Sequence, residues 1–196
     1  MPWEKNFDLD DALDKAMVVF WSKGYNGTSM TDLVNAMEIN KGSLYNAFGS
    51  KDQLFNRVLL RYDQQVRQKR FARLRDVGDT RKIIKMFFED MVSEAIEDDD
   101  KKGCFLINTA LNLPNQPLEI QKIVTEALIE IEEFFMEMIE KDQKEGRLDK
   151  NIDAKEKAKS ILALIVGLRV LARGTYEPQS LEAIKAQAIG LLDPQC

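Results

Sequence analysis

The sequence predicts an all-α protein, and three observations support this. Apolar residues recur at intervals of three and four along most of the chain, which is the spacing of one helix face. No stretch shows the alternation of apolar and polar residues that is typical of a β-strand. Of the 196 residues, 44% are hydrophobic, so the chain can bury a sizeable core. No apolar run reaches the ~18 residues of a membrane span, so no membrane partner is expected.

The first predicted helix covers residues 8–23. Asp8 can cap its start, because a carboxylate accepts hydrogen bonds from the N–H groups of the first turn. Gly24 is expected to end it, since glycine readily adopts the positive φ found just beyond many helices. Its apolar stripe consists of Leu9, Ala12, Leu13, Ala16, Met17, Val19 and Phe20.

Two short helices are predicted next. Thr28 or Ser29 is expected to cap the second helix, which ends at Met37. Residues 38–40 form a tight connector, and residues 41–48 form the third helix. Two short helices joined by a turn of three or four residues make a helix-turn-helix.

A long fourth helix follows, with Ser50 as its N-cap, and runs to about Arg75. The sequence Val-Gly-Asp-Thr after it is the first convincing domain boundary. We therefore expect a three-helix domain at residues 1–50, a connecting helix at 51–76 and a second domain at 77–196.

The second domain is also expected to be helical. Polar, proline-containing and glycine-containing breaks divide it into five segments of helical periodicity. These segments are residues 80–96, 104–113, 118–144, 154–174 and 178–192.

The charge is unevenly distributed, although the sequence pI is about 5.0. Residues 23–75 contain ten basic and four acidic side chains, a net charge of +6, while the whole chain has −5. A basic segment in an acidic protein can be the footprint of a polyanion such as DNA. A solvated helix face is the alternative interpretation.

The chain contains no histidine, which excludes His-dependent catalytic triads and the commonest zinc sites. It also has no glycine-rich phosphate loop, so an enzyme on a helical scaffold is the weaker hypothesis. No metal site and no cofactor are expected. A protein-interaction module without DNA is a third hypothesis, which salt-dependent binding to DNA would separate from the first.

The predicted third helix has two different sides on a helical wheel of about 100° per residue. The apolar side, with Leu44, Ala47 and Phe48, must pack on the first two helices. The polar side is then free to face a groove, unless the bundle has no nucleic-acid role. An Asn side chain can pair with adenine in the major groove, so Asn46 is the best candidate for base recognition. The polar side consists of Lys41, Gly42, Ser43, Tyr45 and Asn46.

A group of short motifs lies within residues 7–55. These motifs are Gly24-Tyr25, Thr28-Ser29-Met30, Lys41-Gly42-Ser43-Leu44-Tyr45, Phe48 and Ser50-Lys51-Asp52-Gln53-Leu54-Phe55. Together they strongly resemble the TetR family of bacterial transcriptional regulators, and the helix layout is similar to that family over the whole chain.

The resemblance implies a homodimeric regulator whose partners are double-stranded operator DNA and a small-molecule inducer. A cytoplasmic location is expected because two cysteines make no disulfide framework. Repression is the default of the family, and activation is the alternative. Thr28 would cap the second helix and meet the phosphate backbone together with Ser29 and Thr31. Tyr45 and Lys51 would also contact phosphates. The residues expected to face base edges or nearby phosphates are Lys41, Gly42, Ser43 and Asn46.

The second domain is expected to hold the inducer in an apolar pocket with a few polar groups. Aromatic and methionine stripes at helical spacing are often only core, which is the alternative here. The residues proposed for the pocket are Phe87, Phe88, Met91, Cys104, Phe105, Asn108, Phe134 and Met138.

The two cysteines, Cys104 and Cys196, form no disulfide framework. Cys104 follows two lysines near a predicted helix start, and both features lower a thiol pKa. It is therefore either a redox or electrophile sensor or a buried structural thiol.

The last two predicted helices are expected to form the dimer interface. The helix at 154–174 is apolar over much of its circumference, and Gly167 would permit close approach of a symmetry mate. Alternatively, these side chains only fill the monomer core. The residues proposed for the interface are Ala163, Gly167, Val170, Leu181, Ile184 and Ala188.

Overall fold

A computed structural model describes residues 7–174 and 176–193, and every regular element in these ranges is a helix. The predicted all-α class is therefore confirmed. No helix in this part of the chain is long and apolar enough to cross a lipid bilayer. Cys196 lies outside the described residues.

The N-terminal domain contains α1 (Leu9–Gly27), α2 (Met30–Met37) and α3 (Lys41–Phe48). As predicted, Asp8 caps α1, and its carboxylate accepts a hydrogen bond of 2.8 Å from the N–H of Asp10. As predicted, Gly24 interrupts the regular helix. It has a φ of +71° and produces a kink, after which one more helical turn leads to α2.

The connecting helix changes its geometry in the middle. It consists of α4 (Lys51–Asp63), a π-helical turn η1 (Gln64–Gln68) and α5 (Lys69–Arg75). The ends agree with the prediction. The π turn was not predicted, because the apolar spacing of the sequence gives no sign of it.

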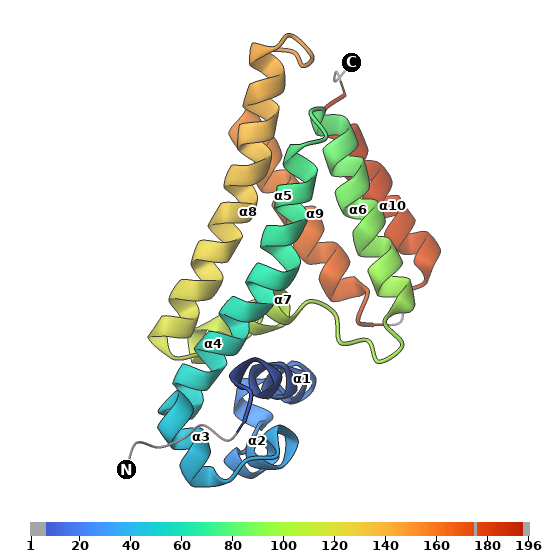
Figure 1. Ribbon diagram of the computed structural model, residues 1–196. Coiled ribbons are helices and arrows are strands. Elements are labelled where there is room, and N and C mark those ends of the chain that lie inside the picture. The colour runs from blue at the N-terminus through green and yellow to red at the C-terminus, as the bar shows by residue number, and fades with distance from the viewer. Residues whose placement is uncertain (1–6, 175, 194–196) are drawn as a thin grey trace.

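The second domain is a bundle in which α5, α6, α8, α9 and α10 run alongside one another above the N-terminal domain (Figure 1). The short α7 lies at the base of this bundle and contacts both α1 and α4. The elements of this domain are α6 (Thr80–Glu97), α7 (Phe105–Ala110), the 3-10 turn η2 (Leu113–Asn115), α8 (Leu118–Lys144), α9 (Ala154–Leu171) and α10 (Pro178–Gly190).

Aromatic side chains join the two domains. Phe105 of α7 packs against Phe55 of α4 with ring centres 5.5 Å apart, and against Trp21 of α1 at 6.2 Å. The Trp21 indole N–H also donates a hydrogen bond of 3.1 Å to the carbonyl of Gly103. A displacement of α7 would therefore act directly on α1 through these contacts.

Candidate DNA-binding surface, ligand cavity and dimer face

The third helix is fixed on the N-terminal domain by its apolar side, as predicted. Leu44 and Phe48 are buried, and Phe48 lies 6.5 Å from the ring of Phe7. Asn40 caps the helix by accepting a hydrogen bond of 2.8 Å from the N–H of Ser43. The polar side of α3 consequently faces outwards.

This outward face brings together the residues that the helical wheel selected. Lys41, Gly42, Tyr45 and Asn46 are exposed, and Ser43 is half-buried. Tyr45 is 43% exposed, and the Lys41 ammonium lies 6.0 Å from its ring centre. A hydroxyl, an ammonium and a carboxamide on one exposed helix face suit both phosphate and base contacts.

A side chain at position 42 would crowd the cap of this helix. A Cβ atom on Gly42 would lie 3.2 Å from the Asn40 carboxamide oxygen, which is tighter than ordinary contact. Glycine therefore keeps the N-terminal turn of α3 narrow, so that a duplex can come close to its backbone N–H groups.

The role predicted for Thr28 is wrong. Its side chain is only 2% exposed, and its hydroxyl donates a hydrogen bond of 2.7 Å to the carbonyl of Gly24. Ser29 is the N-cap of α2, in a capping box with Asp32. Ser29 and Thr31 are exposed and remain candidates for phosphate contacts, whereas the Thr28 hydroxyl is already used inside the protein.

Lys51 lies at the first position of α4 and is half-buried. Its ammonium is 4.3 Å from the centre of the Tyr25 ring, and burial lowers the pKa of Lys51. The Tyr25 hydroxyl donates to Asp52, and burial together with this carboxylate raises the pKa of Tyr25 to about 12. The phenol ring thus positions the lysine beside the helix-turn-helix.

The second domain contains a small cavity, of about 40 Å³, beside the π turn of the connecting helix. Three of the predicted pocket residues, Phe87, Met91 and Cys104, line it. The remaining lining residues come from α4, η1, α5, α7, α8 and α9 and include both apolar and charged side chains. The cavity is therefore enclosed by the helix that leads to the DNA-binding domain.

A buried ion pair, Asp63–Arg67, forms part of the polar cavity wall. Arg67 of η1 pairs with Asp63 at 2.7 Å and with Glu130 of α8 at 2.6 Å. Burial lowers the pKa of Arg67, but these two carboxylates raise it above its usual value. Sequence reasoning missed this pair, although the spacing of four residues between opposite charges was a usable signal.

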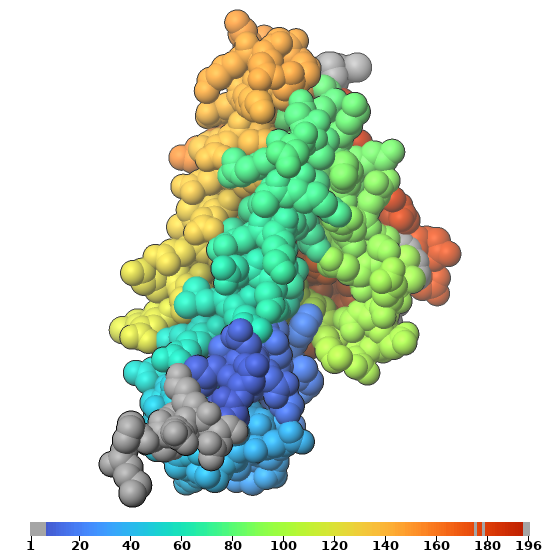
Figure 2. All heavy atoms as spheres, in the orientation of Figure 1, coloured from blue at the N-terminus to red at the C-terminus, as the bar shows by residue number. Residues whose placement is uncertain are grey.

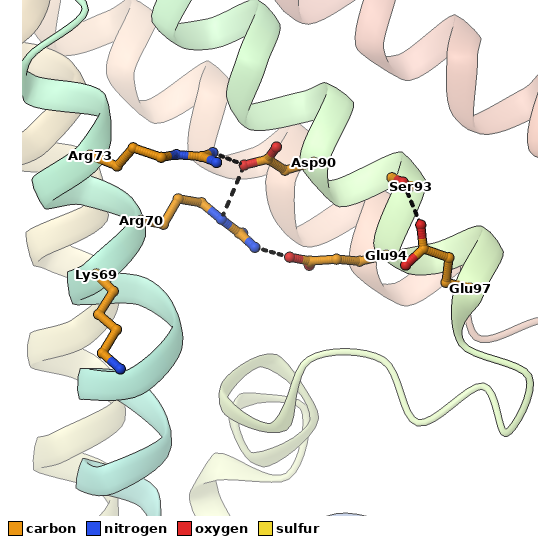
Figure 3. Close-up of a pocket in the computed structure, with 7 residues that line it drawn as sticks. All are labelled: Lys69, Arg70, Arg73, Asp90, Ser93, Glu94 and Glu97. Carbon is orange, nitrogen blue, oxygen red and sulfur yellow. Dashed lines mark hydrogen bonds and ion pairs between the residues drawn. The ribbon is translucent and has the colours of Figure 1, made fainter.

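Arginines also connect α5 to α6. Figure 3 shows Arg73 reaching Asp90, and Arg70 reaching both Asp90 and Glu94. Glu94 accepts a second hydrogen bond, 2.5 Å long, from Arg169 of α9. Arg169 was also missed, although a single arginine within the apolar stretch of α9 indicates a buried charge that needs a partner.

Cys104 lies next to this charged group. The Tyr62 hydroxyl donates to its Sγ atom at 3.6 Å, and burial raises the pKa of Tyr62 well above its usual value. Burial lowers the pKa of Arg169, but the adjacent Cys104 thiol and Glu94 raise it above its usual value. Cys104 is half-buried, so sensor and structural roles both remain predictions.

A hollow opens beside the cavity. It measures about 390 Å³ and shares Tyr62, Val66 and Arg169 with the cavity wall. In Figure 2 the surface is hollowed between the teal of α4 and α5 and the green of α6. These three residues therefore form the wall that the cavity and the hollow have in common.

The other predicted pocket residues lie elsewhere. Phe105 and Asn108 line a separate cavity between α1 and α7. Phe134 stacks on Phe71 with ring centres 4.1 Å apart and borders an outer groove. Phe88 and Met138 are buried and line neither cavity, so the core interpretation holds for them. Their helical spacing showed burial but not which neighbours they meet.

The predicted dimer residues fall into two groups. Ala163 is exposed, and Gly167, Val170 and Ile184 are half-buried. A Cβ atom on Gly167 would meet no other atom of the described residues within 4 Å. These residues of α9 and α10 are therefore available to a partner.

Leu181 and Ala188 do not belong to such a surface, which corrects the prediction. Leu181 is 3% exposed and Ala188 is fully buried. Both lie in the hydrophobic core, on α10, which packs against α6. The alternative interpretation, that they fill the monomer core, is correct for these two residues.

Comparisons with known proteins agree with this geometry. Residues 12–58 match the family model of bacterial regulatory proteins of the TetR family, and residues 81–188 match a tetracycline repressor-like C-terminal domain. The transcriptional repressor ComR of Escherichia coli is 30% identical over 181 residues, which cover 92% of this chain and 85% of ComR. YezE of Bacillus subtilis, an uncharacterised transcriptional regulator, is 26% identical over 96% of this chain and 98% of its own length.

Solved structures give the same result. A cysteine mutant of the TetR-family regulator CifR, from a structure of its complex with 26-base-pair operator DNA, superposes with a TM-score of 0.85 at 30% identity. The superposition covers 95% of this chain and 98% of that one. These findings agree with a regulator rather than an enzyme, and the chain belongs to the TetR family of DNA-binding transcriptional regulators.

Proposed function

We propose that this protein is a homodimeric repressor that a small molecule releases from its operator. The observation that carries the proposal is the structure of α3, whose apolar side is buried while Lys41, Tyr45 and Asn46 are exposed. ComR is named a repressor, and the CifR structure is of a complex with operator DNA, which supports the same role here.

Two copies must hold their recognition helices at a fixed separation, about 34–36 Å for half-sites one turn apart, or at a related spacing. The α9–α10 face can provide the contact, because Ala163 and Gly167 leave room for a partner's helix. Such a contact would be isologous, with the same patch on both copies.

The cavity beside the π turn is the proposed inducer site, and at about 40 Å³ it must widen to admit an organic molecule. It is lined by Phe87, Met91 and Cys104 and by charged groups of the connecting helix. A ligand that prefers the conformation with the wrong helix spacing weakens DNA binding by its differential affinity for the two states. A coupling of about 1–3 kcal/mol corresponds to a ~5–150-fold loss.

Selection of bound genomic fragments tests the DNA-binding part. The wild-type protein should enrich a short symmetric sequence, and its affinity should fall steeply with salt because phosphate contacts release counterions. Asn46→Ala should relax the preference at one base position at a cost of about 1–3 kcal/mol. Salt-independent binding without an enriched sequence would contradict the proposal.

Reciprocity tests the ligand-responsive part. A compound that lowers operator affinity must bind less tightly, by the same factor, when operator is saturating. Calorimetry with and without operator measures this factor, and the sedimentation coefficient should show an intact dimer. An inducer whose affinity is unaffected by operator would contradict this mechanism for that compound.

A further inference from the structure

A second cavity, of about 160 Å³, lies between the two domains. The end of α1 forms one wall, and α7 with the turn after it forms the other. This cavity is distinct from the proposed inducer site and shares none of its lining residues. The inference below is independent of the proposed function.

One side of this cavity is aromatic. Five rings line it, so that a flat apolar molecule would find ring edges and faces on several sides. The rings also pack against one another. The ring centre of Phe55 lies 5.5 Å from that of Phe105 and 5.1 Å from that of Tyr25. The rings are those of Phe20, Trp21, Tyr25, Phe55 and Phe105.

The other side carries an unused hydrogen-bond acceptor. Gln116 lines the cavity and is only 8% exposed. Its Oε1 atom is buried and has no hydrogen-bond partner among the described residues, and rotation about the last side-chain torsion, which is broad in glutamine, presents it to the cavity. Two neighbouring donors on the wall are already used within the protein. Asn108 donates to the carbonyl of Lys102 at 2.7 Å, and Thr109 donates to the carbonyl of Phe105 at 2.9 Å. A buried acceptor without a donor is costly, so this oxygen favours a ligand that supplies one.

The charge and the size of the cavity further restrict the class of ligand that fits. Among the described residues, the one charged side chain that lines this cavity is Lys23, and Asp32 neutralises it at 2.6 Å. The site therefore suits a neutral molecule. An apolar cavity of about 150 Å³ in another protein holds one benzene ring, so 160 Å³ corresponds to one six-membered ring with a small substituent.

We propose that this cavity binds a neutral monocyclic aromatic compound that carries a hydroxyl or amino group. The ring lies among the aromatic side chains, and the substituent donates its hydrogen bond to Gln116 Oε1. The ligand thereby contacts both domains at once.

Phenol and toluene are the probes for this proposal, because they share ring and size and differ in the donor. Trp21 lines the cavity, and Trp3 is the only other tryptophan, so a Trp3→Phe background leaves Trp21 as the fluorescent reporter. Binding of each probe is titrated by fluorescence and checked by calorimetry.

Gln116→Leu is the decisive variant. It removes the acceptor at similar volume, and it should fold normally, since replacing an unpartnered buried polar group by an apolar one is not destabilising. Phenol affinity should fall about five- to tenfold, the value of one hydrogen bond, while toluene affinity is not weakened. Gln64→Leu, at an exposed position on η1, should leave both affinities unchanged.

Three results would overturn the proposal. The first is equal weakening of phenol and toluene by Gln116→Leu, and the second is an unchanged phenol affinity. The third is no phenol binding up to its solubility limit, which would mean that the acceptor is satisfied by an ordered water only.

Discussion

The hydroxyls of Thr28 and Ser29 lie one residue apart and serve different purposes. Thr28 closes the last turn of α1 from inside the protein, and Ser29 caps α2 at the surface. We expect Thr28→Val to lower the free energy of unfolding by about 1 kcal/mol, because one buried hydrogen bond is lost. Operator affinity, measured by fluorescence anisotropy well below the melting temperature, should stay within about twofold of wild type. A flatter salt dependence would instead indicate a phosphate contact.

Tyr45 is expected to contact phosphate through its exposed hydroxyl. Tyr45→Phe should weaken binding to all DNA sequences by a similar factor, of about 3–10-fold, because phosphate contacts carry little sequence information. Anisotropy titrations on the operator and on random DNA give the two factors. Tyr176→Phe is the matched control, since that side chain is also exposed but lies in the second domain. An altered base preference at unchanged overall affinity would rule out the phosphate role.

For single residues, the sequence predicts which side chains are buried better than it predicts which residues they contact. The wheel correctly placed Leu44 and Phe48 inside, because an eight-residue helix on a small bundle has only one side to bury. Thr28 and Ser29 could not be told apart, since both residue types cap helices. Leu181 and Ala188 were assigned to the wrong surface for a related reason: an apolar residue on the last helix can pack on α6 or on a partner.

Among the elements, the π turn carries a buried charge that depends on its ion-pair partners. It carries Arg67, whose guanidinium is buried and depends on Asp63 and Glu130. Asp63→Asn should lower the free energy of unfolding by about 3 kcal/mol, because it leaves a buried cation with one partner fewer. Urea unfolding measures the change, and Asp63→Leu combined with Arg67→Met should recover most of it. Glu137→Gln, at an exposed pair with Arg75, should cost less than about 0.5 kcal/mol.

A second buried carboxylate joins α8 to the start of α6. Asp142 accepts hydrogen bonds from the N–H of Thr80 at 2.8 Å and from Arg147 at 2.5 Å. Burial raises the pKa of Asp142, but these partners lower it below the usual value. Its stabilising effect is therefore fully present above the unfolded pKa of about 3.9 and is lost as the pH falls through the lower folded pKa.

Asp142→Asn tests this linkage. At pH 7 the variant should lose about 1–2 kcal/mol of stability, because the Thr80 N–H and the partly exposed Arg147 lose a charged acceptor. The difference from wild type should shrink as the pH falls from about 4 through the lower folded pKa, below which the wild-type carboxyl is also neutral. Urea midpoints across this pH range provide the comparison. A constant difference at every pH would show that the charge is not what matters.

Helix boundaries were predictable where the sequence contains a strong stop signal. The α8 bounds agree with the prediction because Pro117 precedes the helix and Gly146 follows it. The π turn was not predictable, since hydrophobic spacing reports which residues are buried and not which carbonyl each N–H reaches. The helix predicted at 104–113 spans only six residues in the structure, Phe105–Ala110. Its end was mispredicted because the sequence contains no stop signal before Pro114.

For the whole molecule, the decisive question is how two copies meet. Gly167→Trp should keep the monomer fold, because there is open space at the Cβ position, but it should block the proposed dimer. Sedimentation velocity should then show a folded monomer. Fluorescence anisotropy should show that this monomer binds operator at least tenfold more weakly than wild type. Lys155→Trp, at an exposed position on the same helix, is the control. A Gly167→Trp protein that remains a stable dimer would place the interface elsewhere.

The two-part organisation and the helix-turn-helix could be predicted, because they depend on local spacing and on motifs within a few dozen residues. The contacts between the domains could not. Trp21, Tyr62 and Phe105 come from three distant parts of the chain, and only the fold brings their rings within 5.0–6.2 Å of one another. Arg169 meets Glu94 for the same reason.

The π turn also has a consequence for comparing relatives. A π turn contains one residue more than an α-helical turn, and one residue corresponds to a rotation of about 100° around the helix axis. The side chains before Gln64 and after Gln68 are therefore out of phase by one position. A relative whose connecting helix is regular throughout must lack one residue here if both of its ends are to face the same neighbours. Its alignment with this chain should show a one-residue gap between Asp63 and Lys69, and a gap-free alignment would pair the wrong faces beyond that point.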